Sequence, residues 1–246
     1  MSATIPPPTH IRTLTPTLTT FSRPFTRSNI LPIGIRMTCI KLPTHQLVLI
    51  GPTPLDPTTL AALQNLNTPV AYIICPNVVH HLSVAAYKEH WPDAKIVGVK
   101  GLPEKRPDVT FDHVLTTSTS PPLPFEPHLQ FRHFAGSRNQ DTAYYHPESR
   151  TLITADLLFN LPPTEQYGPD HTFGLFARLA HSFFKPGTRS HKFFTRYAMA
   201  ADADVMKKDV EFVDQNWKIE RIIPAHGDII ETDAHKAFRD AFAWYF

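Results

Sequence analysis

The chain has 246 residues, of which 42% are hydrophobic, 11% aromatic and 19% charged, and this balance is typical of a globular protein rather than a disordered or fibrous one. The formal net charge of +2 is too small to indicate a nucleic-acid partner, and none is predicted. No apolar run approaches the roughly 20 residues of a membrane-spanning helix, and the N-terminus lacks the apolar stretch of a signal peptide. Two cysteines in apolar runs, Cys39 and Cys75, are expected to be reduced, so the sequence favours a cytoplasmic protein.

Residues 1–30 are predicted to form an extended N-terminal arm without regular elements of its own, because prolines interrupt it repeatedly. The arm is rich in Ser and Thr, contains Arg12, Arg23 and Arg27, and has no acidic residue; the first is Asp56. This composition is similar to that of a transit peptide, but the prolines would break the amphipathic helix that such a peptide needs. Targeting is therefore the less favoured interpretation, and the folded domain is predicted to span residues 31–246.

The first elements of this domain have strong local signals. Residues 35–42 and 46–51 are short apolar runs separated by Pro43 and Thr44, which predicts a β-hairpin. Asp56 followed by Pro57 is typical of a helix start. The continuous apolar runs 70–75 and 95–99 indicate buried strands on either side of a helix that follows Asn77, so this region is predicted to be a βαβ unit.

The second half is predicted to be another β-rich region followed by helices. Residues 129–134, 143–146 and 151–155 are consecutive short strands, and residues 221–224 form a last strand. Apolar residues recur at helical spacing on both sides of this last strand, from Met206 to Trp217 and from Ala234 to Tyr245. The fold class is therefore a mixed α/β (α+β) one.

Candidate metal ligands follow three of the predicted strands. The chain has 14 histidines, and most are expected at the surface or in packing roles. His80 and His81 come after the strand that ends at Cys75, Asp156 follows the strand 151–155, and His226 follows the last strand in the string PAHGD. Ligands that converge at a sheet edge lie where strands end, so these positions predict a shared metal site.

The same segments resemble the metallo-β-lactamase superfamily from about Ile35 to the C-terminus. ICPNVVHHLSVAAYKEHWPDAKIVG is similar to the family's strand, histidine-rich loop and helix, GSRNQDTAYYHPESRTLITADLLF to its middle segment, and IIPAHGD to its last histidine motif. RPF, PIGIRMTCIKL, PTPLD and PNVVHH resemble a divergent branch known as DUF4336. The resemblance implies a four-layer αββα sandwich and brings no settled activity.

The resemblance also implies a reduced metal site. The family's first metal position uses three histidines, and this sequence has Pro76, Val78 and Ser137 there, so that position is predicted to be absent. The ligands of the second position correspond to His80, His81, Asp156 and His226, with His81, Asp156 and His226 the preferred set.

One divalent metal is predicted at this second position, with Zn²⁺ first and Fe²⁺ or Mn²⁺ as alternatives. Four protein ligands would close the site, whereas a catalytic site would result if His80 turned away. The competing interpretation needs no metal at all, since these residues can also cap helices and lock turns. Asn77 and Ser137 are expected near the mouth of the site as substrate-orienting residues, and Asp228 is expected to hold the ring of His226.

Residues 160–205 are predicted to be a helical, aromatic insertion. It is rich in Phe and contains five Lys or Arg residues with no acidic residue from His171 to Ala201. The favoured interpretation is a helical insertion that packs on the sandwich or on a second subunit of a homodimer. A mobile cover over a site for an anionic or aromatic substrate and a surface-bound amphipathic segment are the alternatives.

Two classes of function compete at this point. The leading hypothesis is a metal-dependent, hydrolase-like enzyme that acts on a small ester, thioester or other carboxylate derivative. A repurposed, non-hydrolytic enzyme of the same fold is a variant of it. The rival is a non-catalytic binding or scaffolding protein that kept the fold after losing the binuclear centre. The sequence assigns no catalytic base and indicates no organic cofactor.

Overall fold

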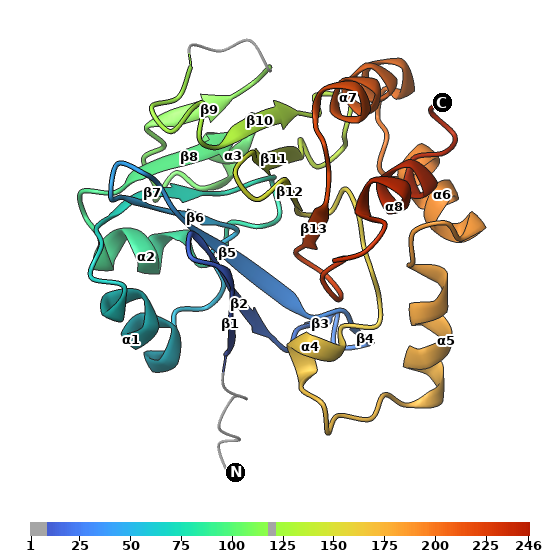
Figure 1. Cartoon of the computed structure of the whole chain (residues 1–246), viewed down its shortest axis with the longest axis horizontal. Coiled ribbons are helices and arrows are strands. Elements are labelled where there is room, and N and C mark those ends of the chain that lie inside the picture. Colours follow the sequence, from blue (N-terminus) through green and yellow to red (C-terminus); the bar gives the residue numbers. More distant parts are fainter. Residues whose placement is uncertain (1–8, 118–121) are drawn as a thin grey trace.

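Two β-sheets face each other with helices on their outer sides, as the computed structural model shows for residues 9–117 and 122–246 (Figure 1). Helices α1 (Pro57–Asn65), α2 (Val84–His90) and α3 (Leu102–Lys105) belong to the first half of the chain. Helices α7 (Ala203–Asn216) and α8 (Ala234–Ala241) lie on the other side of the molecule. The predicted αββα sandwich is confirmed.

The larger sheet has the strand order β1-β2-β5-β6-β7-β8-β9. Strands β1, β2, β5 and β6 pair antiparallel, whereas β6, β7, β8 and β9 pair parallel. This change of direction explains why β7 and β8, which have neighbours on both sides and helices over them, are continuous apolar runs. The strand bounds are β1 (His10–Thr15), β2 (Leu18–Arg23), β5 (Ile35–Lys41), β6 (Leu47–Ile50), β7 (Val70–Ile74), β8 (Lys95–Val99) and β9 (His113–Leu115).

The smaller sheet contains β10 (Gln130–His133), β11 (Thr142–His146), β12 (Thr151–Thr154) and β13 (Arg221–Pro224) in this order. The first three strands are antiparallel, and β13 joins β12 in parallel. A parallel partner places the carboxyl ends of β12 and β13 at the same edge of the sheet, so Asp156 and His226 come together there. A short ribbon of β3 (Thr26–Arg27) and β4 (Leu31–Pro32) lies apart from both sheets.

Two hydrophobic cores hold the layers together. The first contains Leu63 and Tyr87 from α1 and α2, the strands of the larger sheet, and Tyr144 and Ile153 from the smaller sheet. The second packs α7 and α8 against the smaller sheet through residues such as Val210 and Phe238. Both cores therefore use the apolar faces that the sequence periodicity predicts.

The N-terminal region differs from the prediction of an extended arm. Residues 10–23 form the β1–β2 hairpin, and β2 pairs with β5 along its full length, from Leu18 opposite Ile40 to Arg23 opposite Ile35. Leu18 and Phe21 are fully buried in the core. The Thr-rich sequence suits an edge hairpin because Thr favours strands while staying polar, so the expected arm is wrong for these residues. Residues 1–8 of that arm lie outside the described residues.

Short helices occupy the segment between β12 and α7. They are α4 (Thr164–Tyr167), α5 (Leu175–Phe183), α6 (Arg189–Phe193) and a π-helical turn, η1 (Phe194–Ala198). Figure 1 shows α5 and α6 at the outer edge of the molecule, beside α8 and apart from the larger sheet. None of the helices in the described residues is both long and apolar enough to cross a membrane.

Candidate metal centre

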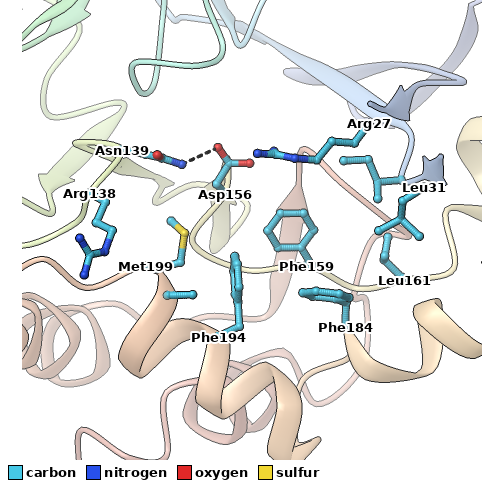
Figure 2. A pocket seen from close by; sticks show the side chains of 12 residues that line it. Arg27, Leu31, Arg138, Asn139, Asp156, Phe159, Leu161, Phe184, Phe194 and Met199 are labelled. Carbon is cyan, nitrogen blue, oxygen red and sulfur yellow. Dashed lines mark hydrogen bonds between the residues drawn. The ribbon is translucent and has the colours of Figure 1, made fainter. Parts of the chain in front are cut away.

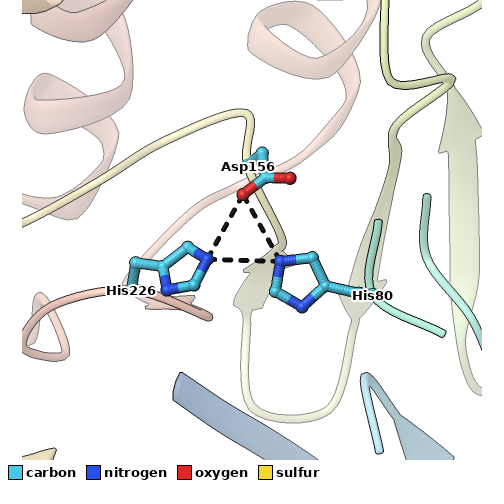
Figure 3. A group of neighbouring side chains, drawn as sticks. All are labelled: His80, Asp156 and His226. Carbon is cyan, nitrogen blue, oxygen red and sulfur yellow. Dashed lines mark hydrogen bonds and ion pairs between the residues drawn. The ribbon is translucent and has the colours of Figure 1, made fainter. Parts of the chain in front are cut away.

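Three side chains converge where β7, β12 and β13 end (Figure 3). The Nε2 atoms of His80 and His226 are 3.2 Å apart, and each lies 3.3 Å from Oδ1 of Asp156. Zinc bonds of about 2.0–2.1 Å at tetrahedral angles place ligand atoms about 3.3 Å from one another, so the three donor atoms have the spacing of one face of a zinc tetrahedron. All three residues are buried. The residues present therefore fit a metal ion.

His226 is held in the orientation and tautomer that a metal requires. Its Nδ1 lies 2.6 Å from the carbonyl oxygen of Gly34, which accepts hydrogen bonds only, so Nδ1 carries the proton. The Nε2 lone pair of the neutral ring is then directed at the cluster. The ring also stacks on Phe159 at 5.1 Å and on Phe25 at 6.3 Å, which fixes its plane.

His80 is positioned by a turn at Asn77. The side-chain oxygen of Asn77 accepts hydrogen bonds from the backbone N–H groups of Val79 and His80 at 3.0 and 2.8 Å. This Asx-type turn directs the chain after β7 so that the ring of His80 points at Asp156. Asn77 was expected to orient a substrate, but it is fully buried and instead shapes this turn, and its amide has a further role.

The amide nitrogen of Asn77 connects Asp156 to a second buried carboxylate, that of Asp141. It donates to Asp156 Oδ2 at 2.8 Å and to Asp141 Oδ1 at 2.7 Å. Asp141 also accepts from the backbone N–H of Asp156 and from the hydroxyl of Ser137. Asn139 donates to Asp156 Oδ2 at 3.2 Å. These bonds leave Asp156 Oδ1 as the oxygen that faces the two imidazoles.

Burial and neighbouring charges shift the protonation of the cluster. Burial lowers the pKa of His226, because the charged ring would lose its hydration. Burial also opposes a charged His80, but the adjacent carboxylate of Asp156 outweighs it and raises the pKa of His80. For Asp156, burial is again the largest single influence, yet His80 and His226 together keep its pKa well below the usual value. Asp156 is therefore an anion facing a pair of imidazoles.

His81 is not a member of the cluster, although the sequence favours it over His80. Its Nδ1 lies 3.2 Å from the guanidinium of Arg106, which can only donate, so Nδ1 is already used as an acceptor. Arg106 also donates to the backbone carbonyl of His81 at 2.7 Å. Burial and the charges of Lys105 and Arg106 lower the pKa of His81, and the same charges oppose a metal cation. His81 turns away, and His80 takes the place assigned to it.

Ser137 and Asp228 have different roles from those predicted. Ser137 is fully buried, and its hydroxyl donates to Asp141 at 3.0 Å, so it supports the cluster from behind rather than facing a substrate. Asp228 accepts a hydrogen bond from the backbone N–H of Glu165 at 2.9 Å. Because the Gly34 carbonyl takes the Nδ1 proton of His226, the expected contact between Asp228 and that ring is not formed.

Sequence reasoning missed Gly34, Asp141, Asn139 and Gln166. Gln166 accepts from the backbone N–H of Gly227 and donates to the carbonyl of Ala225, so it clamps the loop that carries His226. Asp141 could have been recognised from the sequence, since it is an acidic residue directly before the buried strand β11. The others act through backbone or amide groups and leave no distinctive pattern in the sequence.

Two cavities adjoin the cluster and share Arg27 and Asp156. The larger cavity has a volume of about 300 Å³ and is drawn in Figure 2. Arg27 points toward Asp156 there, and the rings of Phe159, Phe184 and Phe194 form an apolar side. Arg138 also lines it. The smaller, of about 140 Å³, is lined by His80, His226 and apolar residues. The candidate metal site thus lies beside space for a small molecule.

The comparisons with known structures agree on the fold. A metallo-β-lactamase from Pontibacter korlensis matches with a TM-score of 0.64 and 12% identity, over 96% of this chain and 98% of that one. The metallo-β-lactamase FIM-1 from Pseudomonas aeruginosa, in a mono-zinc form, matches with a TM-score of 0.67 and 13% identity, over 98% and 96%. A diflavin flavoprotein fragment from Nostoc sp. PCC 7120 matches with a TM-score of 0.64 and 16% identity, over 98% of both chains.

The sequence comparisons identify the family. No curated protein sequence matches the chain. The family model described as "Domain of unknown function (DUF4336)" matches residues 27–167, more than half of the chain, and this span includes Asn77, His80 and Asp156. The chain therefore belongs to the DUF4336 family and has the metallo-β-lactamase fold.

Proposed function

We propose that this protein is a mononuclear, metal-dependent enzyme of the hydrolase type, with zinc as its metal. The observation that carries the proposal is the triangle of buried donor atoms from His80, Asp156 and His226, 3.2–3.3 Å apart. Three protein ligands are typical of catalytic zinc sites, which keep a position open for water or substrate, whereas structural sites have four. The removal of His81 from the predicted ligand set therefore favours catalysis over a purely structural metal.

The residues of the site would divide the work between them. His80, Asp156 and His226 would hold the metal, which when bound supplies Lewis-acid activation of a water or a carbonyl group. Asn77 holds Asp156 with Oδ1 toward the imidazoles. Phe25 and Phe159 flank the ring of His226 and exclude water from it. The proposed reaction adds water across an ester or thioester bond and releases a carboxylate together with an alcohol or thiol.

The larger cavity indicates the kind of substrate. Arg27 and Arg138 line it beside Asp156 and would attract a negatively charged group. The rings of Phe159, Phe184 and Phe194 offer an apolar side for an aromatic or acyl group. A volume of about 300 Å³ suits a small molecule rather than a polymer chain. The proposed substrate is a small, anionic ester or thioester with an aromatic or acyl part.

Metal analysis of the purified protein tests the site. We expect about one equivalent of zinc in the wild type, and its loss in His80→Ala, Asp156→Ala and His226→Ala. The matched control is His81→Ala, which removes a neighbouring imidazole outside the cluster and is expected to keep the metal. Circular dichroism of each variant separates loss of the ion from loss of the fold.

Hydrolysis of chromogenic esters and thioesters tests the activity. We expect activity that is lost with a chelator, is restored by zinc, and is higher for substrates that carry a carboxylate than for neutral analogues. If metal-loaded protein hydrolysed none of these substrates, the proposed enzyme activity would be contradicted and the non-catalytic binding protein would be the better interpretation. Wild-type protein that contains no metal, and whose stability does not change when zinc is added, would contradict the metal site itself.

A further inference from the structure

Helix α5 directs its large apolar side chains away from the protein. Leu175, Phe176, Leu179 and Phe183 are 83, 66, 59 and 48% exposed. At 3.6 residues per turn they fall within one arc of about 100° on the helix. The buried residues of α5, Ala177 and His181, lie on the opposite side. The helix is therefore amphipathic with its apolar side outward, the reverse of a helix that serves only to cover a core.

The next two elements expose further aromatic side chains. Phe193 at the end of α6 and Tyr197 in η1 are also exposed, with relative exposures of 57 and 55%. Figure 1 shows α5 and α6 following one another along the outer edge of the molecule. We call the segment from Leu175 to Ala198, which contains α5, α6 and η1, the apolar edge. Four large apolar side chains exposed on one face of a helix indicate a partner, because scattered single residues would need none.

The charged side chains of the segment that carries the apolar edge are all basic, and the nearby Asp240 of α8, which lies against Gly187, is paired with Lys236. The segment from His171 to Ala201 contains no acidic residue and five basic ones, Arg178, Lys185, Arg189, Lys192 and Arg196. None of these cations forms an ion pair with any residue that the structure describes. Elsewhere in the chain acidic residues are frequent enough that the net charge is only +2. The apolar edge therefore offers unneutralised positive charge next to exposed Leu and Phe.

Exposed apolar side chains next to unpaired cations fit an anionic membrane surface better than they fit a second copy of the chain or a single-stranded nucleic acid. In a two-fold homodimer the same surface meets itself, so the five cations of each copy would face those of the other. Single-stranded nucleic acid is bound by aromatic stacking in a basic groove and gives no role to Leu175 and Leu179. In a bilayer, the aliphatic and aromatic side chains enter the acyl region while the cations meet anionic headgroups.

We propose that the apolar edge binds the surface of anionic lipid membranes, with α5 lying in the interface. The proposal does not depend on the metal centre. The body of α5 rests on the protein through His181, whose Nε2 lies 2.6 Å from the carbonyl oxygen of Pro32, so the helix is already formed before it meets lipid. The conformational entropy of folding this helix then does not oppose binding, in contrast to a segment that folds only on the membrane.

Vesicle flotation of the full chain tests the proposal. We expect binding to vesicles of phosphatidylcholine with phosphatidylglycerol, and weak or no binding to phosphatidylcholine alone. Leu175→Ser with Leu179→Ser should reduce binding at least about tenfold, because two leucines no longer enter the acyl region. Arg178→Ala with Lys185→Ala should reduce it by more than about tenfold, and added salt should weaken wild-type binding.

Matched controls lie on other faces of the molecule. Leu82→Ser removes an equally exposed leucine (78%), and Lys208→Ala removes an exposed cation of α7; both should bind as the wild type does. Near-ultraviolet circular dichroism checks that each variant keeps its tertiary structure.

Three results would overturn the proposal. The first is equal or absent binding to both kinds of vesicle by the folded wild type. The second is a dimer in light scattering that Leu175→Ser with Leu179→Ser dissociates, without vesicle binding, which would assign the apolar edge to a second copy. The third is retention of a single-stranded oligothymidine without vesicle binding, which would assign it to nucleic acid.

Discussion

Asn77 is the residue on which the geometry of the candidate metal centre depends most directly. Its side chain accepts from the backbone N–H groups of Val79 and His80 and donates to Asp141 and Asp156. One amide therefore sets the turn that carries one ligand and holds the carboxylate of another. An aspartate could replace only the accepting half of this role, since it has no N–H to donate.

The substitution Asn77→Ala tests this role. We expect zinc affinity to fall on the order of 10–100-fold, because residues that orient metal ligands have effects of that size. The free energy of unfolding should also fall by about 1–3 kcal/mol, since buried carboxylate oxygens lose their donors. Competition with a fluorescent zinc chelator measures the affinity. Unchanged affinity in Asn77→Ala would show that Asp156 holds its position without this amide.

At the scale of single elements, helix α1 begins at a cap that joins it to the N-terminal hairpin region. Asp56 accepts from the backbone N–H of Thr59 at 2.7 Å, from the hydroxyl of Thr9 and from the guanidinium of Arg23 at 3.2 Å. Partial burial works against the charge of Asp56, but these donors outweigh it and lower its pKa. The cap thus ties the N-terminal hairpin to α1.

Two substitutions separate the cap from the charge. Asp56→Ala should reduce the free energy of unfolding by about 1 kcal/mol or more through loss of the cap. Asp56→Asn keeps a capping oxygen but loses the charge, so it should be less destabilising. Because the folded pKa of Asp56 lies below its unfolded value, the charge stabilises the fold above the unfolded pKa and loses this effect as the pH falls through the folded pKa.

Denaturant titrations at a series of pH values measure these effects. The stability difference between wild type and Asp56→Asn should be largest near neutral pH and should shrink in acid. A difference that stays constant down to the lowest pH at which the protein folds would contradict the lowered pKa.

Strands with strong apolar runs were predictable from the sequence, and the hairpin before them was not. Continuous runs such as Val70–Ile74 have few alternatives to a buried strand, and the ligands at their ends follow from this. The hairpin β1–β2 alternates Thr with apolar residues beside prolines, so its local pattern also fits a loop. Only its pairing with β5, a tertiary contact, decides between the two.

The choice between His80 and His81 was equally beyond local patterns. The two residues are neighbours in the sequence, and a shift of the loop by one residue would bring the ring of His81 to the position that His80 occupies. The structure decides through Asn77, which orients His80, and Arg106, which occupies His81. Arg106 is 25 positions away in the sequence, and Asn77 acts on the backbone N–H of His80, so the sequence pattern around the two histidines does not distinguish them.

At the scale of the whole molecule, Arg36 connects the two sheets behind the metal centre. It is fully buried on β5 and donates to the carbonyl oxygens of Pro224 and Gly227 at 2.6 and 2.7 Å, on either side of His226. It also donates to Ser22 in the N-terminal hairpin and lies 3.5 Å from Glu165. The first and last thirds of the chain therefore meet at one guanidinium.

Arg36→Met is expected to destabilise the protein by about 3–5 kcal/mol, because it leaves the buried carbonyl oxygens of Pro224 and Gly227 without their donor and removes one of the two cations beside Glu165. Zinc affinity should fall with it, since the loop of His226 loses its support. The matched control is Arg12→Met, which removes ion pairs with the same Glu165 and with Glu231 from a side chain that is 38% exposed, and it should cost only about 1 kcal/mol. Equal effects of the two substitutions would contradict a bridging role for Arg36.

The hydrogen bond between Gly34 and His226 spans 192 positions of the chain and has a consequence for biosynthesis. A nascent polypeptide on the ribosome exposes His80 and Asp156 long before residue 226 emerges, and two ligands alone hold zinc weakly. The proposed metal would therefore bind only at the last stage of maturation, after β13 has docked. A product that terminates before this strand would lack His226 and would hold the proposed metal only weakly, however much of the larger sheet it has built.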